Sequence, residues 1–441
     1  MSDKPKSPIW HPFTQHAINP DSIHIDRAAG PYLFARNIEN GVPKGERRII
    51  DAISSWWVIS HGHCHPHIIN AVQEQAARLD QVIFAGFTHD PAEQLAERLI
   101  KVTDDSFDHV FFSDSGSTAV EVALKMAIGY WAHIEKPRQK ILAFQDGYHG
   151  DTFGTMSAGG RAVYNKVYEP YLFEVEHIPL PEAGKEAESL QRLEDYLNAN
   201  KDNVAAFIFE PLLLGAGGMK IYSPSTLKAM VDMCRAHGVL LIADEVMTGF
   251  GRTGTMFACE QAEFMPDIIC MSKGLTGGFL PMGATLCTNA IYMAFYHKDR
   301  AKMFFHSSSF MGNAMACAAA NASLDIWDKE PVMDRIDDIA KSHADAVHRF
   351  SERGDVTNIR QKGTMIAMDV VDDQGTGYLS QVQPRLYDLF LSQDMLLRPL
   401  GNSIYILPPY CIAQQDLNEI YDAIEYVLDT VADEQKQRAA S

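Results

Sequence analysis

The chain of 441 residues lacks the features that mark several classes of protein. It carries no run of like charges, and its net charge of -19 argues against a surface for nucleic acid. No segment approaches the roughly 18 consecutive apolar residues of a membrane-spanning helix, and the N-terminus has no apolar core of a secretion signal. We therefore expect a cytoplasmic protein that binds neither nucleic acid nor a membrane.

Cysteine is also sparse. Seven cysteines are scattered along the chain, an odd number, and none lies in a C-x-x-C pair, which is typical of reduced thiols rather than of a disulfide framework. The segment HGHCHPH, residues 61–67, has alternating imidazoles beside a proline, but neither a helical i, i+4 pair nor further ligands at zinc spacing. We interpret it as a loop leading into a helix over 67–80. A metal site is the weaker alternative, and we predict no metal.

What the sequence does contain, over its middle, is a series of short apolar runs separated by segments of helical period. Because these runs are continuous rather than alternating, they are typical of parallel strands that are covered on both faces. We therefore predict an α/β fold with a mostly parallel central sheet. The expected strands are 109–116, 140–144, 204–210, 238–244 and 266–273, and the expected helices are 117–133 and 223–238.

The pattern of predicted helices and strands changes after about residue 330. Short strands near 364–370 and 403–407 lie between two charged helical segments, which is an α+β pattern, and the first sixty residues contain aromatic-rich turns and hairpin-like pieces. We predict a large domain over 61–330 and a smaller α+β domain formed by 1–60 together with 331–441.

The most informative stretch is GVLLIADEVMTGFGRTG, residues 238–254, in which an apolar strand ends in Asp244 and Glu245. Burying an ionised carboxylate is costly unless a cation or several hydrogen bonds meet it. Adjacent side chains of a strand point to opposite faces, so the two acids cannot address the same group. A positive group is therefore expected at the end of this strand.

Other candidate functional residues also follow predicted strands. Ligands of such sheets bind beyond the carboxyl ends of the strands. Gly116 and Ser117 open a helix and offer free backbone N–H groups to an anion, although a capped helix is the plainer reading. Lys273 is a candidate Schiff-base lysine if it is desolvated, or else a lysine that extends to solvent. Tyr148, in QDGYHGDT, could stack on a ligand ring or simply anchor its loop.

These residue types converge on one cofactor. Pyridoxal phosphate needs a lysine for a Schiff base, an acid for its pyridinium nitrogen, an anion cup for its phosphate and an aromatic side chain for its ring. The pyridinium would then be the cation that the buried acid requires.

The order of SDSGSTAVEVALKMA, GYHGDT, ADEVMTGFGRTG, MSKGLTGG and FMGNAMACAAA resembles the class III aminotransferases of PLP fold type I over nearly the whole chain. The resemblance implies that Lys273 carries the cofactor and that Asp244 keeps the pyridine nitrogen protonated. It also implies that Gly116 and Ser117 bind the phosphate and that Tyr148 lies over the ring, where it reaches substrate as well.

The resemblance further implies a homodimer with shared active sites. Ser308 and Ser309 would reach the phosphate of the neighbouring subunit, and Ser307 would lie near the substrate. The family commonly has Gly-Pro-Thr at these three positions.

For the substrate, the resemblance places Trp56 and Trp57 along the channel, beside Lys273. It gives Arg398 the carboxylate of a keto acid and places Tyr405 near the same end of the channel. Apolar walls with one bidentate anchor suit a long aliphatic acid. Core packing and a surface ion pair are the plainer readings of the tryptophans and of the arginine.

Three segments, residues 9–15, 51–66 and 396–410, resemble the family members that aminate 8-amino-7-oxononanoate to 7,8-diaminononanoate in biotin synthesis. We expect that reaction, with S-adenosylmethionine as the first choice of amino donor. Phe13 stands where many members have Tyr, which leaves lysine or another amine as alternative donors. The rival hypotheses are a broad ω-amine:pyruvate transaminase, a metal-dependent hydrolase that uses the histidine loop, and a catalytically silent binding protein.

Overall fold

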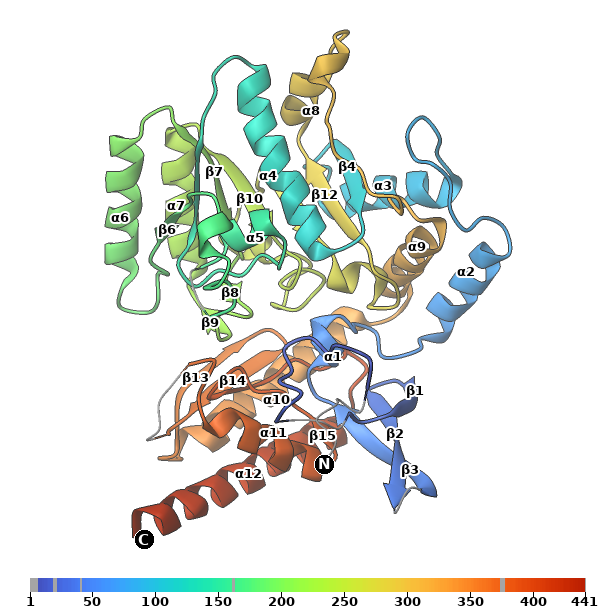
Figure 1. Cartoon of the computed structure of the whole chain (residues 1–441), viewed down its shortest axis with the longest axis vertical. Helices are drawn as coiled ribbons and strands as arrows, with labels where there is room; N and C mark the ends of the chain where they lie inside the picture. Colours follow the sequence, from blue (N-terminus) through green and yellow to red (C-terminus); the bar gives the residue numbers. More distant parts are fainter. Residues whose placement is uncertain (1–6, 19–21, 40–41, 161–162, 373–376, 441) are drawn as a thin grey trace.

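The computed structural model describes residues 7–18, 22–39, 42–160, 163–372 and 377–440 (Figure 1). Its centre is a seven-stranded sheet of order β4-β12-β11-β10-β7-β5-β6, in which β12 runs antiparallel to both neighbours and the remaining strands are parallel. In that order the strands are His109–Ser113, Gly283–Cys287, Ile268–Met271, Leu240–Asp244, Val204–Phe209, Lys140–Phe144 and Glu176–Ile178. The predicted mostly parallel α/β sheet is confirmed, whereas the strands β12 and β6 were not foreseen.

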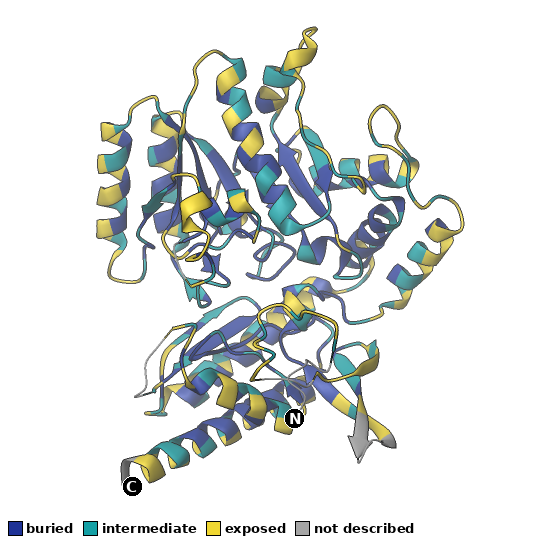
Figure 2. Ribbon diagram, viewed as in Figure 1, coloured by how far each residue is buried: buried dark blue, intermediate teal, exposed yellow. Residues whose placement is uncertain are grey.

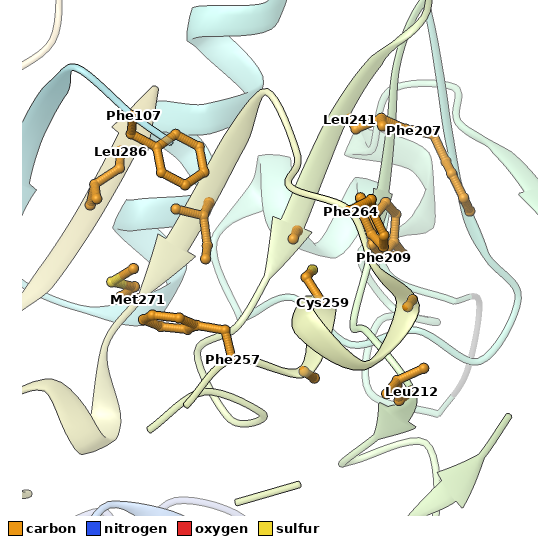
Figure 3. Packing of buried hydrophobic residues seen from close by; sticks show 14 of the residues in the cluster. Phe107, Phe207, Phe209, Leu212, Leu241, Phe257, Cys259, Phe264, Met271 and Leu286 are labelled. Carbon is orange, nitrogen blue, oxygen red and sulfur yellow. The ribbon is translucent and has the colours of Figure 1, made fainter. Parts of the chain in front are cut away.

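Both faces of this sheet are buried, as the continuous apolar runs indicated. Along β10, Leu241 belongs to the hydrophobic cluster on one face and Ile242 to the cluster on the other. Figure 3 shows part of the first cluster, where Phe207, Phe209 and Phe264 lie together. The helices around the sheet are α2 (Pro66–Ala76), α3 (Asp90–Val102), α4 (Gly116–His133), α6 (Glu186–Ala199), α7 (Pro224–Ala236), α8 (Asn289–Phe295) and α9 (Ala314–Lys329).

Helix α7 begins and ends where its sequence indicates. The Ser223 hydroxyl accepts a hydrogen bond from the Thr226 N–H at 3.1 Å, and Pro224 occupies the first turn, where its missing N–H costs nothing. Gly238, just beyond the last turn, has a φ of +62°, a conformation that glycine adopts without the steric penalty of a side chain. The chain then enters β10, and so arrives at Asp244.

Below the central sheet in Figure 1 lies a second group of elements, which draws on both ends of the chain. One small sheet has the order β1-β2-β3-β15 and another has the order β13-β14-β16. These strands are Ile25–Ala29, Tyr32–Glu39, Val42–Asp51 and Met395–Leu396, then Val356–Lys362, Met365–Val370 and Ser403–Ile406. The helices are α10 (Val332–Ser351), α11 (Val382–Ser392) and α12 (Gln414–Ala440).

Most of one hydrophobic cluster lies in this second group, where it joins β3, β14 and β16 to the helices α10, α11 and α12, and the cluster extends to α2 and α9 of the first group. We propose the domain division given above because the second group has its own sheets and holds most of this cluster. Figure 2 shows the same pattern in both groups, with the inward faces of the helices buried and the outward faces exposed. Within the described residues, no helix is both long enough and apolar enough to cross a membrane.

Short elements lie where the two groups face each other. They are α1 (Ser54–Trp57), α5 (Phe153–Ala158), β8 (Leu213–Leu214) and β9 (Lys220–Ile221).

Candidate active site

Lys273 lies two residues beyond the end of β11 and opens a short 3-10 helix, Lys273–Thr276. Its Nζ lies 5.1 Å from the centroid of the Trp57 ring. Burial lowers the pKa of Lys273, and the negative charges of Asp244 and Glu210 oppose that shift only in part. Burial therefore favours the neutral, nucleophilic form of this lysine, and the two acids weaken that preference without reversing it.

The two acids at the end of β10 point in opposite directions, as strand geometry requires. Asp244 is 4% exposed, and its Oδ2 lies 2.7 Å from Nδ1 of His149. Glu245 faces the protein core instead, where it accepts hydrogen bonds from the Cys259 N–H and the Thr248 hydroxyl. Burial raises the pKa of Glu245 to about 7. Only Asp244 is placed to act in the site.

A cavity of about 190 Å³ lies at this edge of the sheet. The side chains and backbone that line it are Trp57, Gly116, Ser117, Tyr148, His149, Gly150, Glu210, Asp244, Val246, Met247, Ser272 and Lys273. The structure thus brings together the five residues predicted to hold the cofactor within one chain. It adds His149 and Glu210, which the sequence reasoning did not single out.

Two glycines line the end of this cavity where α4 begins. A Cβ added at Gly116 would lie 2.7 Å from the Val246 side chain, and one at Gly150 would lie 2.1 Å from the Ser117 hydroxyl. Gly116 is also the first residue of α4, where free N–H groups and the helix dipole favour an anion. A side chain at either position would therefore collide with a neighbouring residue that also lines the cavity.

Glu210 follows β7 and supports the loop that carries Tyr148. Its carboxylate accepts hydrogen bonds from the Tyr148 N–H and the Gly215 N–H, both at 2.9 Å. Burial raises the pKa of Glu210 to about 7. The signal for this residue was present in the sequence, since VAAFIFE also ends an apolar strand in an acid, as GVLLIAD does.

His149 holds Asp244 and has a second nitrogen that is buried. Its Nε2 has no hydrogen-bond partner among the described residues. Its Nδ1 contacts Asp244, which lies 95 positions away, so no local sequence motif could have identified this pair.

Aromatic rings continue outward from the cavity. The ring of Tyr148 lies 6.3 Å from that of Tyr164, which in turn lies 4.6 Å from Tyr378 and 6.1 Å from Phe13. Phe13 lies 5.6 Å from Trp56. These neighbouring rings form a row that leads outward from the cavity beside Lys273, and we call this row, together with Trp57, the aromatic channel.

Arg398 and Tyr405 lie on the tryptophan side of this channel. The guanidinium of Arg398 is 5.8 Å from the Trp56 ring, and its Nη2 donates to the Phe13 carbonyl at 2.8 Å. The buried Tyr405 hydroxyl accepts from Trp57 Nε1 at 2.9 Å. The structure therefore gathers the predicted substrate residues of one chain around one channel.

A second cavity of about 540 Å³ adjoins the first and shares Tyr148 and Gly150 with it. Its walls come from the loop after β5 and from the small-domain strands β13, β14 and β16. The channel thus widens on the side of Tyr148.

Ser307, Ser308 and Ser309 lie elsewhere. They belong to the segment before α9 and do not line either cavity. The Ser308 hydroxyl is buried and has no hydrogen-bond partner among the described residues. Within a single chain, these serines do not meet the predicted phosphate site.

The histidine loop is divided among separate partners. His61 contacts Ser323, and the other three imidazoles contact acids: His63 with Asp51, His65 with Glu330 and His67 with Asp325. Across the described part of the chain, no group of three or more His, Cys, Asp or Glu side chains is placed to hold a metal ion.

Comparison with known proteins shows similarity to aminotransferases. The family model for class-III aminotransferases matches residues 20–428. The adenosylmethionine-8-amino-7-oxononanoate aminotransferase of Synechococcus elongatus is 45% identical over 432 residues, which cover 96% of this chain and 99% of the relative.

Solved structures are also similar over nearly the whole chain. The adenosylmethionine-8-amino-7-oxononanoate aminotransferase of Methanocaldococcus jannaschii has a TM-score of 0.90 at 32% identity, with 96% of this chain and 97% of that chain covered. A PLP-bound amine transaminase from an uncultivated Pseudomonas species has a TM-score of 0.88 at 30% identity, with 96% and 99% covered.

Proposed function

Because this chain belongs to the class-III aminotransferase family, we propose that it transfers an amino group to 8-amino-7-oxononanoate and yields 7,8-diaminononanoate for biotin synthesis. The observation that carries the proposal is the aromatic channel from Lys273 past Trp57 and Trp56 to Arg398. The amino donor we propose is S-adenosylmethionine, in keeping with the names of the relatives.

The cofactor is pyridoxal phosphate, and the cavity of about 190 Å³ has the groups to hold it. Lys273 would carry it covalently, Asp244 would face its pyridine nitrogen, and Tyr148 would lie against its ring. The N–H groups of Gly116 and Ser117 would bind its phosphate. When bound, this group supplies the electron sink that allows an amino group to leave one molecule and enter another.

Lys273 also suits the proton transfers of the reaction. Its lowered pKa increases the fraction of neutral amine near neutral pH. A neutral Nζ can accept a proton and return it, as a general base and then a general acid. His149 keeps Asp244 oriented for this work through the 2.7 Å contact.

The channel suits a long aliphatic acid rather than a short one. Trp56 and Trp57 offer apolar surface along the chain of the substrate, and Arg398 offers the planar fork that binds a carboxylate through two hydrogen bonds. In the present structure Arg398 Nη2 donates to the Phe13 carbonyl, so a substrate carboxylate would take over that donor.

The structure constrains the identity of the amino donor less than that of the acceptor. The cavity of about 540 Å³ beside Tyr148 offers room for a donor as bulky as S-adenosylmethionine. Phe13 lines the channel without the hydroxyl that many family members supply there, so lysine and other amines remain candidates to be compared directly.

We also propose a homodimer with shared active sites. The segments around residues 80–89 and 305–313 are hydrogen-bonded to each other, through Gln81 to the Ser309 carbonyl and His89 to the Gly312 carbonyl. Their exposed apolar side chains are Ile83, Phe87, Phe305 and Phe310. Such a patch favours a second copy of this chain, which would also bring Ser307, Ser308 and Ser309 to the neighbouring site.

The partners we propose are otherwise small molecules, and the compartment we propose is the cytoplasm. The seven cysteines are all free thiols, which suits a reducing environment.

Half-reactions followed by absorbance test the function directly. Purified holoenzyme is mixed with S-adenosylmethionine, lysine or a simple amine, and the loss of the cofactor's aldehyde-form absorbance is timed. The aminated enzyme is then given 8-amino-7-oxononanoate or pyruvate. We expect S-adenosylmethionine and 8-amino-7-oxononanoate to react fastest. Preference for simple amines and pyruvate would replace this proposal with the broad ω-amine:pyruvate transaminase.

A further inference from the structure

The turn that carries Trp56 and Trp57 has an unusual backbone. Ser54, Ser55 and Trp57 have φ values of +54°, +57° and +65°, in the left-handed region that side-chain-bearing residues avoid. Such conformations persist only when surrounding contacts hold them, and they gather at ligand sites. The contacts that hold this turn therefore decide where the two indole rings lie.

Asp51 is the main holding group. It ends β3, it is fully buried, and its carboxylate lies below the turn. The Ser55 N–H donates to both carboxylate oxygens, at 2.8 and 2.7 Å, and the Ser55 hydroxyl donates at 3.1 Å. The Ile53 N–H adds a contact at 3.3 Å.

His63 holds Asp51 in turn. Its Nε2 lies 2.8 Å from Asp51 Oδ2, and its side chain is only 10% exposed. The backbone of His63 is itself fixed by two hydrogen bonds with Gly30, at 2.8 and 3.1 Å, in the connection between β1 and β2. A rigid imidazole thus fixes the carboxylate that fixes the turn.

The same carboxylate sits next to the strand that leads to Arg398. Asp51 pairs with Leu396 in the parallel pairing of β3 with β15, and the Ala52 N–H donates to the Leu396 carbonyl at 3.2 Å. Arg398 follows two residues later. The positions of the two tryptophans and of Arg398 therefore both depend on the backbone around Asp51.

We propose that Asp51 and His63 are positioning residues that set the length selectivity of the channel, by holding the strained turn of Trp56 and Trp57 in register with Arg398. The inference rests on the proposed function in taking this channel as the site of a long carboxylate substrate. It gives a structural role to the contact between His63, in the histidine loop, and Asp51. The proposed chemistry at Lys273 does not involve either residue.

The test is a series of ω-amino carboxylates of increasing chain length, with a short amine lacking a carboxylate as reference. Each compound is used as the amino donor in a single half-reaction that converts the holoenzyme to its aminated form. The rate constant and the apparent binding constant of the donor are measured separately. We expect His63→Leu to reduce the preference for long carboxylates over the short amine about tenfold, mainly through weaker binding. The cofactor absorbance and the short-amine rate stay near wild type.

Two matched variants separate positioning from general damage. His63→Gln places an amide N–H donor where Nε2 was, so it should restore most of the preference. His67→Leu removes the other imidazole whose Nε2 lies 2.8 Å from an acid, Asp325, outside the channel, and should leave the preference unchanged. Equal losses in the His63→Leu and His67→Leu variants would overturn the proposal.

A further variant covers the case in which His63→Leu does not fold. Ser55→Ala removes one hydroxyl contact with Asp51 and keeps the N–H contacts, so we expect a smaller loss of the same preference, accompanied by a shift in tryptophan fluorescence. An unchanged length profile in Ser55→Ala, together with a His63→Leu variant that is either folded and unchanged or cannot be obtained, would refute the inference.

Because the series reports length selectivity for any amine, it remains readable if 8-amino-7-oxononanoate proves not to be the substrate. Failure of the wild type on that keto acid would count against the proposed function alone. A flat length profile in the wild type would count against the positioning role.

Discussion

The cofactor side and the substrate side of this site are built in different ways. On the cofactor side, Asp244, Glu210 and Lys273 follow strands of one sheet, and the ladder of backbone hydrogen bonds fixes where each side chain emerges. On the substrate side, the tryptophans occupy a turn with left-handed residues, which depends on side chains for its shape.

Arg252 illustrates the second kind of construction. Its buried guanidinium donates to the carbonyls of Pro408 at 2.8 Å and Ile59 at 3.0 Å, which joins the end of the tryptophan segment to the C-terminal part of the chain. A sheet edge would have satisfied such carbonyls with backbone N–H groups. Strand ends thus position the residues that we propose to react, while buried polar side chains hold the loops that we propose to select the substrate.

The largest effect is expected on the cofactor side, at Lys273. Lys273→Ala removes the amine that would carry the cofactor and move the proton, so turnover should fall by at least about 10²–10⁴-fold, the range for a lost acid–base group. Borohydride treatment followed by peptide mass measurement should label the wild type at this residue and leave the variant unlabelled. The exposed Lys228→Ala serves as the control. Cofactor attached to another lysine in the wild type would contradict the assignment.

Asp244→Asn should come next. The amide keeps the size of the side chain and can still accept from His149, but it no longer offers a negative charge to the pyridine nitrogen, so turnover should fall about 10²–10³-fold. The thermal midpoint should stay close to that of the wild type. Glu245→Gln makes the same chemical change one residue later and should keep its activity. Near-normal turnover in Asp244→Asn would show that the charge is not needed.

The difference between the two sides also explains what the sequence could predict. Apolar strands that end at or near Asp244 and Lys273 are local patterns, so the sheet could be predicted from them, and they also suggested the residues that we propose to hold the cofactor. His149 was missed because its role depends on a contact with Asp244, 95 residues away. Glu210 was missed although VAAFIFE carries the same local pattern as GVLLIAD. Strand β12 was missed because GATLC is a short antiparallel insertion within a parallel sheet.

On the substrate side, the residues alone left Trp56, Trp57 and Arg398 as ordinary packing or surface groups, and only resemblance to a family favoured another role. Nothing local in DAISSWW indicates a left-handed turn, because serine and tryptophan are not residues that prefer it. The fold around them, through Asp51 and Tyr405, imposes that shape.

Arg398→Ala should have an intermediate effect that is confined to the substrate side. The variant loses charge-assisted hydrogen bonds to a carboxylate, each worth about 1.5–3 kcal/mol, so the KM for the keto acid should rise about 10–100-fold. The half-reaction with a short amine that lacks a carboxylate should change little, because the residue does not line the cofactor cavity. Equal losses for both substrates would mean that Arg398 supports the channel and does not bind the acid.

The smallest effect is expected from Glu245→Gln, which tests the core-facing acid of the pair. Burial raises the pKa of Glu245 from its ordinary 4.5 to about 7. Between these values the native protein keeps a proton that the unfolded chain has released, so the free energy of unfolding of the wild type falls as the pH rises. The glutamine does not titrate, and the Thr248 hydroxyl can reverse its hydrogen bond to accept from the amide.

The stability of Glu245→Gln relative to the wild type should therefore increase from pH 4.5 to pH 7, by up to about 1.4 kcal/mol for each pH unit, and then level off. Unfolding of both proteins in denaturant, at several pH values across this window, measures the difference. Glu210, whose pKa is also raised to about 7, is common to both proteins and cancels. Parallel profiles would mean that Glu245 is already ionised in the core. Asp244 and Glu245 would then differ only in the direction in which their side chains point.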